Sequence, residues 1–102
     1  MPGTIIWIPA DHSEPVLKEE AVVAPDLERM KAYVGGFIEV VHVLYFGKPT
    51  QMVANEEGLL IGLPFNMRAT SLYHLNHIHT RGEFPDSPIV GNAIVLHDLP
   101  LE

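Results

Sequence analysis

The chain has 102 residues, of which 47% are hydrophobic and 19% are charged, and it contains no cysteine. This composition suits one folded domain spanning residues 1–102 and excludes intrinsic disorder, a disulfide framework and thiolate metal sites. Six basic residues against 13 acidic ones give a formal net charge of −7, which disfavours direct binding to nucleic acid or to an anionic membrane. The apolar residues 4–8 are too few for a signal peptide or a membrane span.

The amino-terminal third predicts two strands and a helix. Residues 3–9 combine isoleucines with a tryptophan, as in a strand that is covered on both faces. Residues 16–23 alternate imperfectly and are expected to form an edge strand or a hairpin partner of the first strand. A helix from Pro25 to Val34 follows, because proline suits the first helical turn, apolar residues recur at helical spacing and Gly35-Gly36 can end the helix.

The longest apolar segment covers residues 37–46. Its nearly continuous β-branched and aromatic residues predict a long central strand with both faces largely covered. Strict alternation places Glu39 on one face of this strand and His42 on the other. Residues 51–54 and 59–63 are then expected to form a hairpin, whose turn Asn55 can cap.

The last third predicts a second helix and a final strand. Asn66 suits the N-cap of a short helix over residues 67–76, and residues 77–88 are expected to be a surface loop. Residues 89–96 form the final strand, in which Gly91 marks a bulge or a close backbone approach. These elements predict an α+β fold, with an antiparallel or mixed sheet of about five strands, one well-defined helix and a second short helix. Exposed strand edges make a homodimer one expected assembly.

Four polar residues are candidates for a ligand-binding or partner-binding site: Glu39, Asn55, Asn66 and Arg68. A carboxylate in the middle of the longest strand must reach a partner, water or a pocket. Arg68 is the obvious partner of Glu39, and the pair has two interpretations. It either satisfies a sheet face structurally, which we favour, or lines a cleft with the two asparagines.

The histidines offer a weaker candidate site. His74, His77 and His79 form the densest set of potential metal ligands, but a helix places only the first two on one face and a strand only the last two. Solvated loop histidines are therefore the preferred interpretation. The sequence has no glycine-rich phosphate loop, H-E-x-x-H motif or nucleophile elbow, so we expect neither a cofactor nor catalysis.

Several segments carry a family resemblance. They are Leu27-x-x-Met30-x-x-Tyr33-Val34-Gly35-Gly36-Phe37-Ile38-Glu39-x-Val41, Asn55-Glu56-Glu57-Gly58, Gly62-Leu63-Pro64-x-Asn66 and Ile89-Val90-Gly91-Asn92-Ala93-Ile94-Val95. In order and spacing they resemble domain-of-unknown-function family 3846 over most of the chain. Members are typically small proteins of bacteriophages and bacteria, so the resemblance implies a phage or prophage accessory protein in the cytoplasm of a bacterial host. It implies no chemistry.

Three functions of different classes follow from these observations. The favoured one is a non-enzymatic binding module that acts on a host protein, as an inhibitor or a counter-defence factor. The second is a protein that binds or sequesters a nucleotide-like small molecule, although few basic residues are present to meet phosphates. The third is a metal-dependent enzyme that uses His74, His77 and His79.

Overall fold

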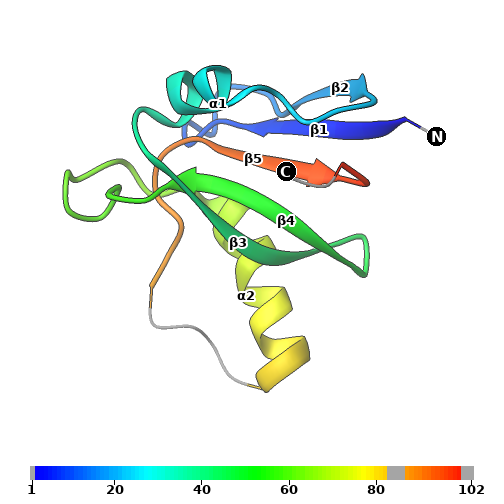
Figure 1. Ribbon diagram of the computed structural model, residues 1–102. Coiled ribbons are helices and arrows are strands. Elements are labelled where there is room, and N and C mark those ends of the chain that lie inside the picture. Colours follow the sequence, from blue (N-terminus) through cyan, green and yellow to red (C-terminus); the bar gives the residue numbers. More distant parts are fainter. Residues whose placement is uncertain (1, 83–86, 100–102) are drawn as a thin grey trace.

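The computed structural model describes residues 2–82 and 87–99. Its elements are β1 (Gly3–Ile8), β2 (Leu17–Ala21), α1 (Leu27–Val34), β3 (Ile38–Tyr45), β4 (Lys48–Asn55), α2 (Met67–Arg81) and β5 (Ala93–His97). The strands form one antiparallel sheet in the order β2-β1-β5-β4-β3 (Figure 1). The predicted α+β class, with a five-stranded sheet and two helices, is confirmed.

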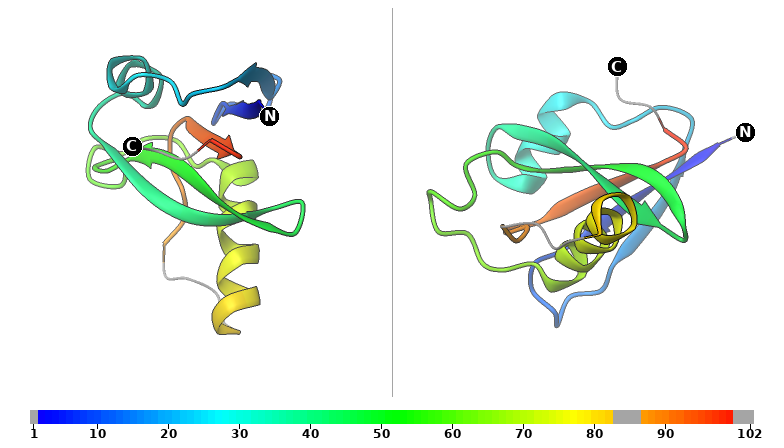
Figure 2. Two further views of the ribbon diagram at one scale, coloured as in Figure 1. Left: turned by 45° about the vertical axis from the view of Figure 1, so that its right-hand side comes forward. Right: turned by 90° about the horizontal axis from the view of Figure 1, so that it is seen from below.

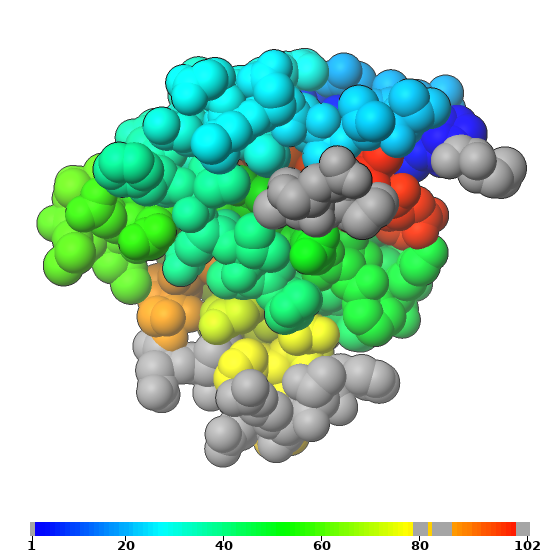
Figure 3. Space-filling model, in the orientation of Figure 1, coloured from blue at the N-terminus to red at the C-terminus, as the bar shows by residue number. Residues whose placement is uncertain are grey.

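The two helices cover opposite faces of the sheet (Figure 2). On one face, Met30 of α1 packs in a core with Trp7 of β1. On the other face, Ala69 of α2 packs in a core with Ile6 of β1. Because successive residues of a strand point to opposite faces, the continuous apolar sequence of β1 fills both cores, as predicted. Figure 3 shows the face that carries α1, with β2 beside it and the β3–β4 hairpin below.

Helix α1 ends where its sequence predicts but begins two residues later than predicted, at Leu27, with Pro25 before its cap. The side chain of Asp26 accepts a hydrogen bond from the backbone N–H of Arg29 at 2.8 Å and caps the first turn. Gly35 takes the left-handed conformation, with φ of 87°, and its N–H donates to the carbonyl of Lys31.

The expected central strand lies at the edge of the sheet. Strand β3 pairs only with β4 among the described residues, which leaves its other backbone edge open. A two-residue turn at Phe46 and Gly47, with φ of 49° and 75°, joins the two strands, as in a type I′ hairpin. Only Val43 of the eight residues of β3 is buried, so the expected cover on both faces was wrong as well. Apolar sequence does not report which strands lie beside a strand, and for that reason the predicted central position was wrong.

The expected hairpin around residues 55–58 is also corrected. Every residue of strand β4, from Lys48 to Asn55, pairs with a residue of β3. Residues 59–63 therefore do not form a strand but continue as turns, in which the N–H of Leu63 donates to the carbonyl of Gly58.

Helix α2 is longer than predicted. Asn66 caps it as expected, but the helix continues to Arg81 through residues that were expected to be a loop, and Gly82 ends it in the left-handed conformation. Strand β5 begins later than predicted, at Ala93. The φ of 75° at Gly91 interrupts extended backbone there, and a Cβ at this position would lie 2.7 Å from the side chain of Leu63, which confirms the close approach. No helix in the described ranges is long and apolar enough to cross a membrane.

Candidate functional site

The four polar residues singled out from the sequence do not meet at one place. Glu39 and Asn55 both line a cavity of about 350 Å³ beside strands β3 and β4. Asn66 and Arg68 lie instead at the amino-terminal end of α2. The cleft shared by all four, which was the alternative interpretation, is therefore not formed.

Asn66 is completely buried and holds three segments together. Its Nδ2 donates to the carbonyls of Ile8 and Gly91, at 3.0 and 2.9 Å, and its Oδ1 accepts from the N–H of Ala69 at 3.0 Å. These bonds use both amide hydrogens and one oxygen lone pair. The side chain therefore joins β1, α2 and the segment before β5, and it presents no free hydrogen to a ligand.

Asn55 has a similar structural task. Its Nδ2 donates to the carbonyl of Val34 at 3.1 Å, and its Oδ1 accepts from the N–H of Glu57 at 2.8 Å. The second bond caps the turn after β4 through the side chain, as the sequence indicated. The first ties this turn to the end of α1.

Arg68 does not pair with Glu39. Its guanidinium donates to the carbonyl oxygens of Pro9, Asp11 and Glu14 at 2.7, 3.1 and 3.0 Å, and so fixes the turn between β1 and β2 onto α2. Glu39 forms no ion pair within the described part of the chain. Burial, together with the charge of Glu56, raises the pKa of Glu39. Two carboxylates near one cavity make that cavity unsuited to a phosphate.

The described histidine side chains of α2 are not grouped as a metal centre. The rings of Tyr73 and His77 lie 5.5 Å apart between centroids. The side chain of His79 lies outside the described residues. Among the residues that are described, no three histidine or acidic side chains are grouped as metal ligands would be.

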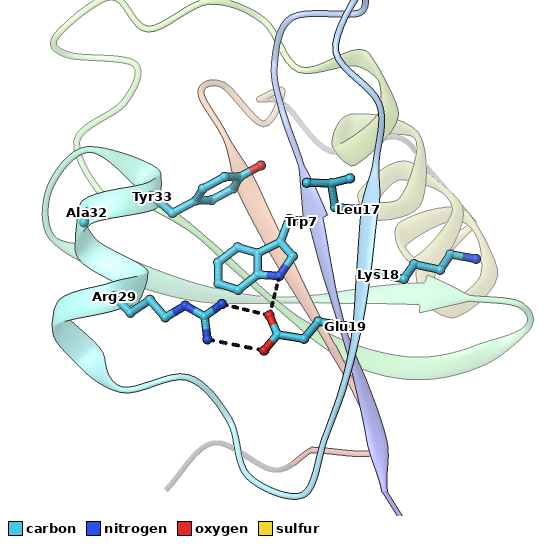
Figure 4. Close-up of a pocket in the computed structure, with 7 residues that line it drawn as sticks. All are labelled: Trp7, Leu17, Lys18, Glu19, Arg29, Ala32 and Tyr33. Atoms are coloured by element: carbon cyan, nitrogen blue, oxygen red, sulfur yellow. Dashed lines mark hydrogen bonds and ion pairs between the residues drawn. The ribbon is translucent and has the colours of Figure 1, made fainter.

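A larger groove of about 680 Å³ lies between α1 and β2 (Figure 4). Its lining comes from three elements, with one residue of β1 as its floor and the other residues from β2 and α1: Trp7, Leu17, Lys18, Glu19, Arg29, Ala32 and Tyr33. None of these was selected from the sequence as a site residue.

Charged and aromatic groups in this groove are held in a fixed arrangement. The carboxylate of Glu19 accepts from Trp7 Nε1 at 3.2 Å and from Arg29 Nη2 at 2.8 Å. The guanidinium of Arg29 also lies over the Trp7 ring, 4.6 Å from its centroid. The hydrogen bond from Arg29 lowers the pKa of Glu19 despite an opposing effect of burial, so the carboxylate is ionised at neutral pH. The positive charge of Arg29 is thus already matched.

Tyr33 supplies the one unsatisfied polar atom of the described groove lining. Its ring meets Trp7 edge to face, with centroids 4.9 Å apart. Its hydroxyl oxygen is buried and has no hydrogen-bond partner among the described residues. Burial, reinforced by the charge of Glu14, raises the pKa of Tyr33. An unpaired buried hydroxyl costs about 1–3 kcal/mol.

The groove could not be found from local sequence patterns. Antiparallel pairing of β1 with β2 puts Glu19 directly opposite Ile5, and Glu19 is therefore the diagonal neighbour of Trp7. Helix α1 then brings Arg29 and Tyr33, four residues apart, over the same place. The only signal in the sequence was a tryptophan next to a helix that carries arginine and tyrosine at helical spacing, and such a pattern also suits an ordinary core.

The fold and the groove together define a small α+β protein with an open groove in which aromatic and charged side chains meet. The model of the family described as domain of unknown function (DUF3846) matches residues 4–100. The chain belongs to this family, as the resemblance of its segments implied. No curated protein and no solved structure matches the chain.

Proposed function

We propose that this protein is a non-enzymatic binding module of phage or prophage origin, which acts on a host protein in the bacterial cytoplasm. Its binding surface is the groove between α1 and β2. The observation that carries the proposal is the convergence of Trp7, Arg29 and Tyr33 in one open groove. Tryptophan, tyrosine and arginine are the residue types most enriched at the energetic centres of protein interfaces.

The rim of the groove supports a protein partner. Leu17, Val22, Val23 and Leu27 come from β2 and from the segment that leads into α1, and their exposed fractions are 59%, 79%, 71% and 52%. Neighbouring exposed apolar side chains on a small domain mark surfaces that other proteins cover. A partner seated on α1 and β2 over the groove would cover these side chains as well.

Charge in the groove favours an apolar segment over an anion. Glu19 already neutralises Arg29, and Lys18 is the only other basic residue in the lining. A phosphate would have to compete with Glu19 for the guanidinium. An apolar side chain would instead fill the groove without displacing Glu19 from Arg29.

A small apolar molecule is the second candidate occupant. The groove volume of about 680 Å³ lies within the usual range for ligand pockets. The same lack of free positive charge disfavours a nucleotide in this groove. A protein and a small molecule are distinguished by the experiment that follows.

Variants on two surfaces test the proposal. Untagged protein is incubated with host lysate, recovered by native chromatography and analysed by mass spectrometry for proteins and small molecules. We expect one stoichiometric host protein, which Leu17→Asp loses because the new charge must be buried at the groove rim. Leu60→Asp is the matched control, since Leu60 is 86% exposed and lies outside the groove lining. A partner lost only with Leu60→Asp, or a small molecule recovered without any protein, would overturn the proposal.

Tyr33→Phe provides a second test that does not depend on disturbing the fold. Removal of an unpaired buried hydroxyl should leave the free energy of unfolding unchanged or raise it by up to about 1 kcal/mol. The same change should leave partner affinity within about twofold, because the hydroxyl is buried and the ring that lines the groove is kept. Urea unfolding and calorimetric titration measure the two effects. A loss of stability without any loss of affinity would assign Tyr33 a purely structural role.

A further inference from the structure

Strand β3 forms a long edge whose one protecting feature is the charge of Glu39. Natural edge strands are kept from pairing with other chains by lysine, proline, bulges or short length. The eight residues Ile38–Tyr45 contain none of these residue types, pair with β4 without interruption, and include one charged residue, Glu39. The sequence of β3 is that of a central strand, although it lies at the edge of this sheet.

Helix α2 extends beyond this edge. It crosses the strands and continues past β3, the last strand of the sheet (Figures 1 and 2). Its first half is buried on the sheet, with Ala69 and Thr70 exposed by 0% and 5%, whereas Leu75 and Ile78 further along are exposed by 55% and 40%. The described part of the chain therefore provides no strand beyond β3 to cover Leu75 and Ile78.

An apolar groove lies between the end of β3 and the second half of α2. It has a volume of about 490 Å³. Its lining is almost entirely apolar and consists of Leu44, Tyr45, Phe46, Gly47, Leu72, Leu75 and Ile78. Phe46 is 85% exposed. A further strand beside β3 would cover this groove and pair the open backbone edge at the same time.

We propose that the β3 strand of a second copy of this chain fills that position. The two β3 strands pair antiparallel about a two-fold axis perpendicular to the sheet, and the two five-stranded sheets become one continuous sheet. Each α2 then covers part of the partner copy's edge. An antiparallel strand is its own complement under such an axis, so both copies use the same surface and the assembly closes as a dimer.

Backbone geometry limits the register of this pairing. Tyr45 and Lys48 flank the two-residue turn and form a hydrogen-bonded pair, so the backbone groups of the even-numbered residues, Val40 among them, point away from β4. With the two-fold axis perpendicular to the sheet, a residue that faces α2 lies opposite a residue that faces the partner's α2. Residues on one face of a strand are all odd-numbered or all even-numbered, so the numbers of two paired residues add up to an even number. The registers that pair the most residues therefore centre on Val41 or on His42.

Charge also favours a second copy as the occupant. In these two registers Glu39 lies opposite Val43 or Tyr45, so the two Glu39 carboxylates do not face each other. Helix α2 contains no acidic residue, whereas Glu39 and Glu56 lie near the partner edge that it would cover. The helix of one copy thus brings no like charge to the acidic cavity of the other.

Sedimentation with two double variants tests the dimer. We expect the wild type to sediment at twice the chain mass of 11.3 kDa. Val40→Lys with His42→Lys places lysine opposite lysine in either register and should weaken the dimer at least tenfold. Val22→Lys with Val23→Lys adds the same charge at exposed positions outside the sheet and should leave the dimer intact. A monomeric wild type at about 100 μM, or a dimer that only the control variant weakens, would overturn the proposal.

Disulfide cross-linking then tests the strand and its register, because the natural chain has no cysteine. If the axis lies at residue 42, residue 42 faces its own copy, and the single variant His42→Cys should cross-link the dimer. If the axis lies at residue 41, residue 40 faces residue 42 of the other copy, and the double variant Val40→Cys, His42→Cys should cross-link it. Glu20→Cys, on the opposite edge strand β2, is the control and should remain monomeric under denaturing conditions. Cross-linking of Glu20→Cys alone, or of none of these variants, would refute pairing through β3.

Discussion

Single asparagine side chains decide much of this fold. Asn66 bonds to two carbonyl oxygens and to one backbone N–H, and the three groups come from different parts of the chain. The sequence predicted the cap, because asparagine before an apolar helical pattern is a common helix start. It could not predict the two carbonyl contacts, since these depend on the placement of Ile8 and Gly91.

Asn66→Ala should reduce the free energy of unfolding by about 3 kcal/mol, because two buried carbonyl groups and one helix N–H lose their partner together. Asp26→Ala is the matched control, since Asp26 caps α1 at an exposed position and should cost only about 1 kcal/mol. Urea unfolding of both variants measures the difference. Equal losses would show that the two carbonyl contacts contribute nothing beyond the cap.

Glu39 gives a prediction of pH dependence. Its raised pKa means that the folded state holds this proton at higher pH than the unfolded state does. The resulting stabilisation is present below the ordinary pKa of 4.5 and is lost as the pH rises through the folded-state pKa. Glu39→Gln should therefore raise the melting temperature at pH 7 and lose this advantage near pH 4. Thermal unfolding at both pH values checks the sign, and Glu20→Gln, at an exposed position of β2, corrects for the change in net charge.

At the scale of elements, Arg68 shows how one side chain replaces regular structure. The turn between β1 and β2 has few backbone partners of its own, and three of its carbonyl oxygens bond to the Arg68 guanidinium. The sequence identified this arginine but assigned it the wrong partner. The predicted partner was chosen by opposite charge alone, whereas backbone carbonyl groups also need hydrogen-bond donors.

Arg68→Ala should lower the free energy of unfolding by about 2 kcal/mol and speed hydrogen exchange in residues 11–15. Arg68→Lys should restore little, because an ammonium group cannot reach three carbonyl oxygens as a planar guanidinium does. Hydrogen exchange followed by mass spectrometry localises the effect. Full restoration by lysine would mean that charge, and not the geometry of the fork, holds the turn.

At the scale of the whole molecule, the two proposed surfaces lie at opposite edges of the sheet. The groove borders β2, which is one edge strand, and the proposed dimer forms through β3, which is the other. A dimer of this kind carries both grooves away from its centre, so each would remain open to a partner. If both proposals hold, one dimer binds two partner molecules, and a partner with two sites would gain affinity from the linkage.

The sequence by itself determined the α+β class, most of the elements, the carboxyl-terminal end of α1, the cap of α2 and the family. These features depend on neighbouring residues, on periodicity or on turn chemistry, all of which are local. Tertiary structure alone decided that β3 lies at an edge, that Arg68 serves a turn and that Trp7 meets Glu19, Arg29 and Tyr33. Each of these depends on strand order and on packing between distant segments, because local patterns fix which face of a strand is buried but not which residues cover it.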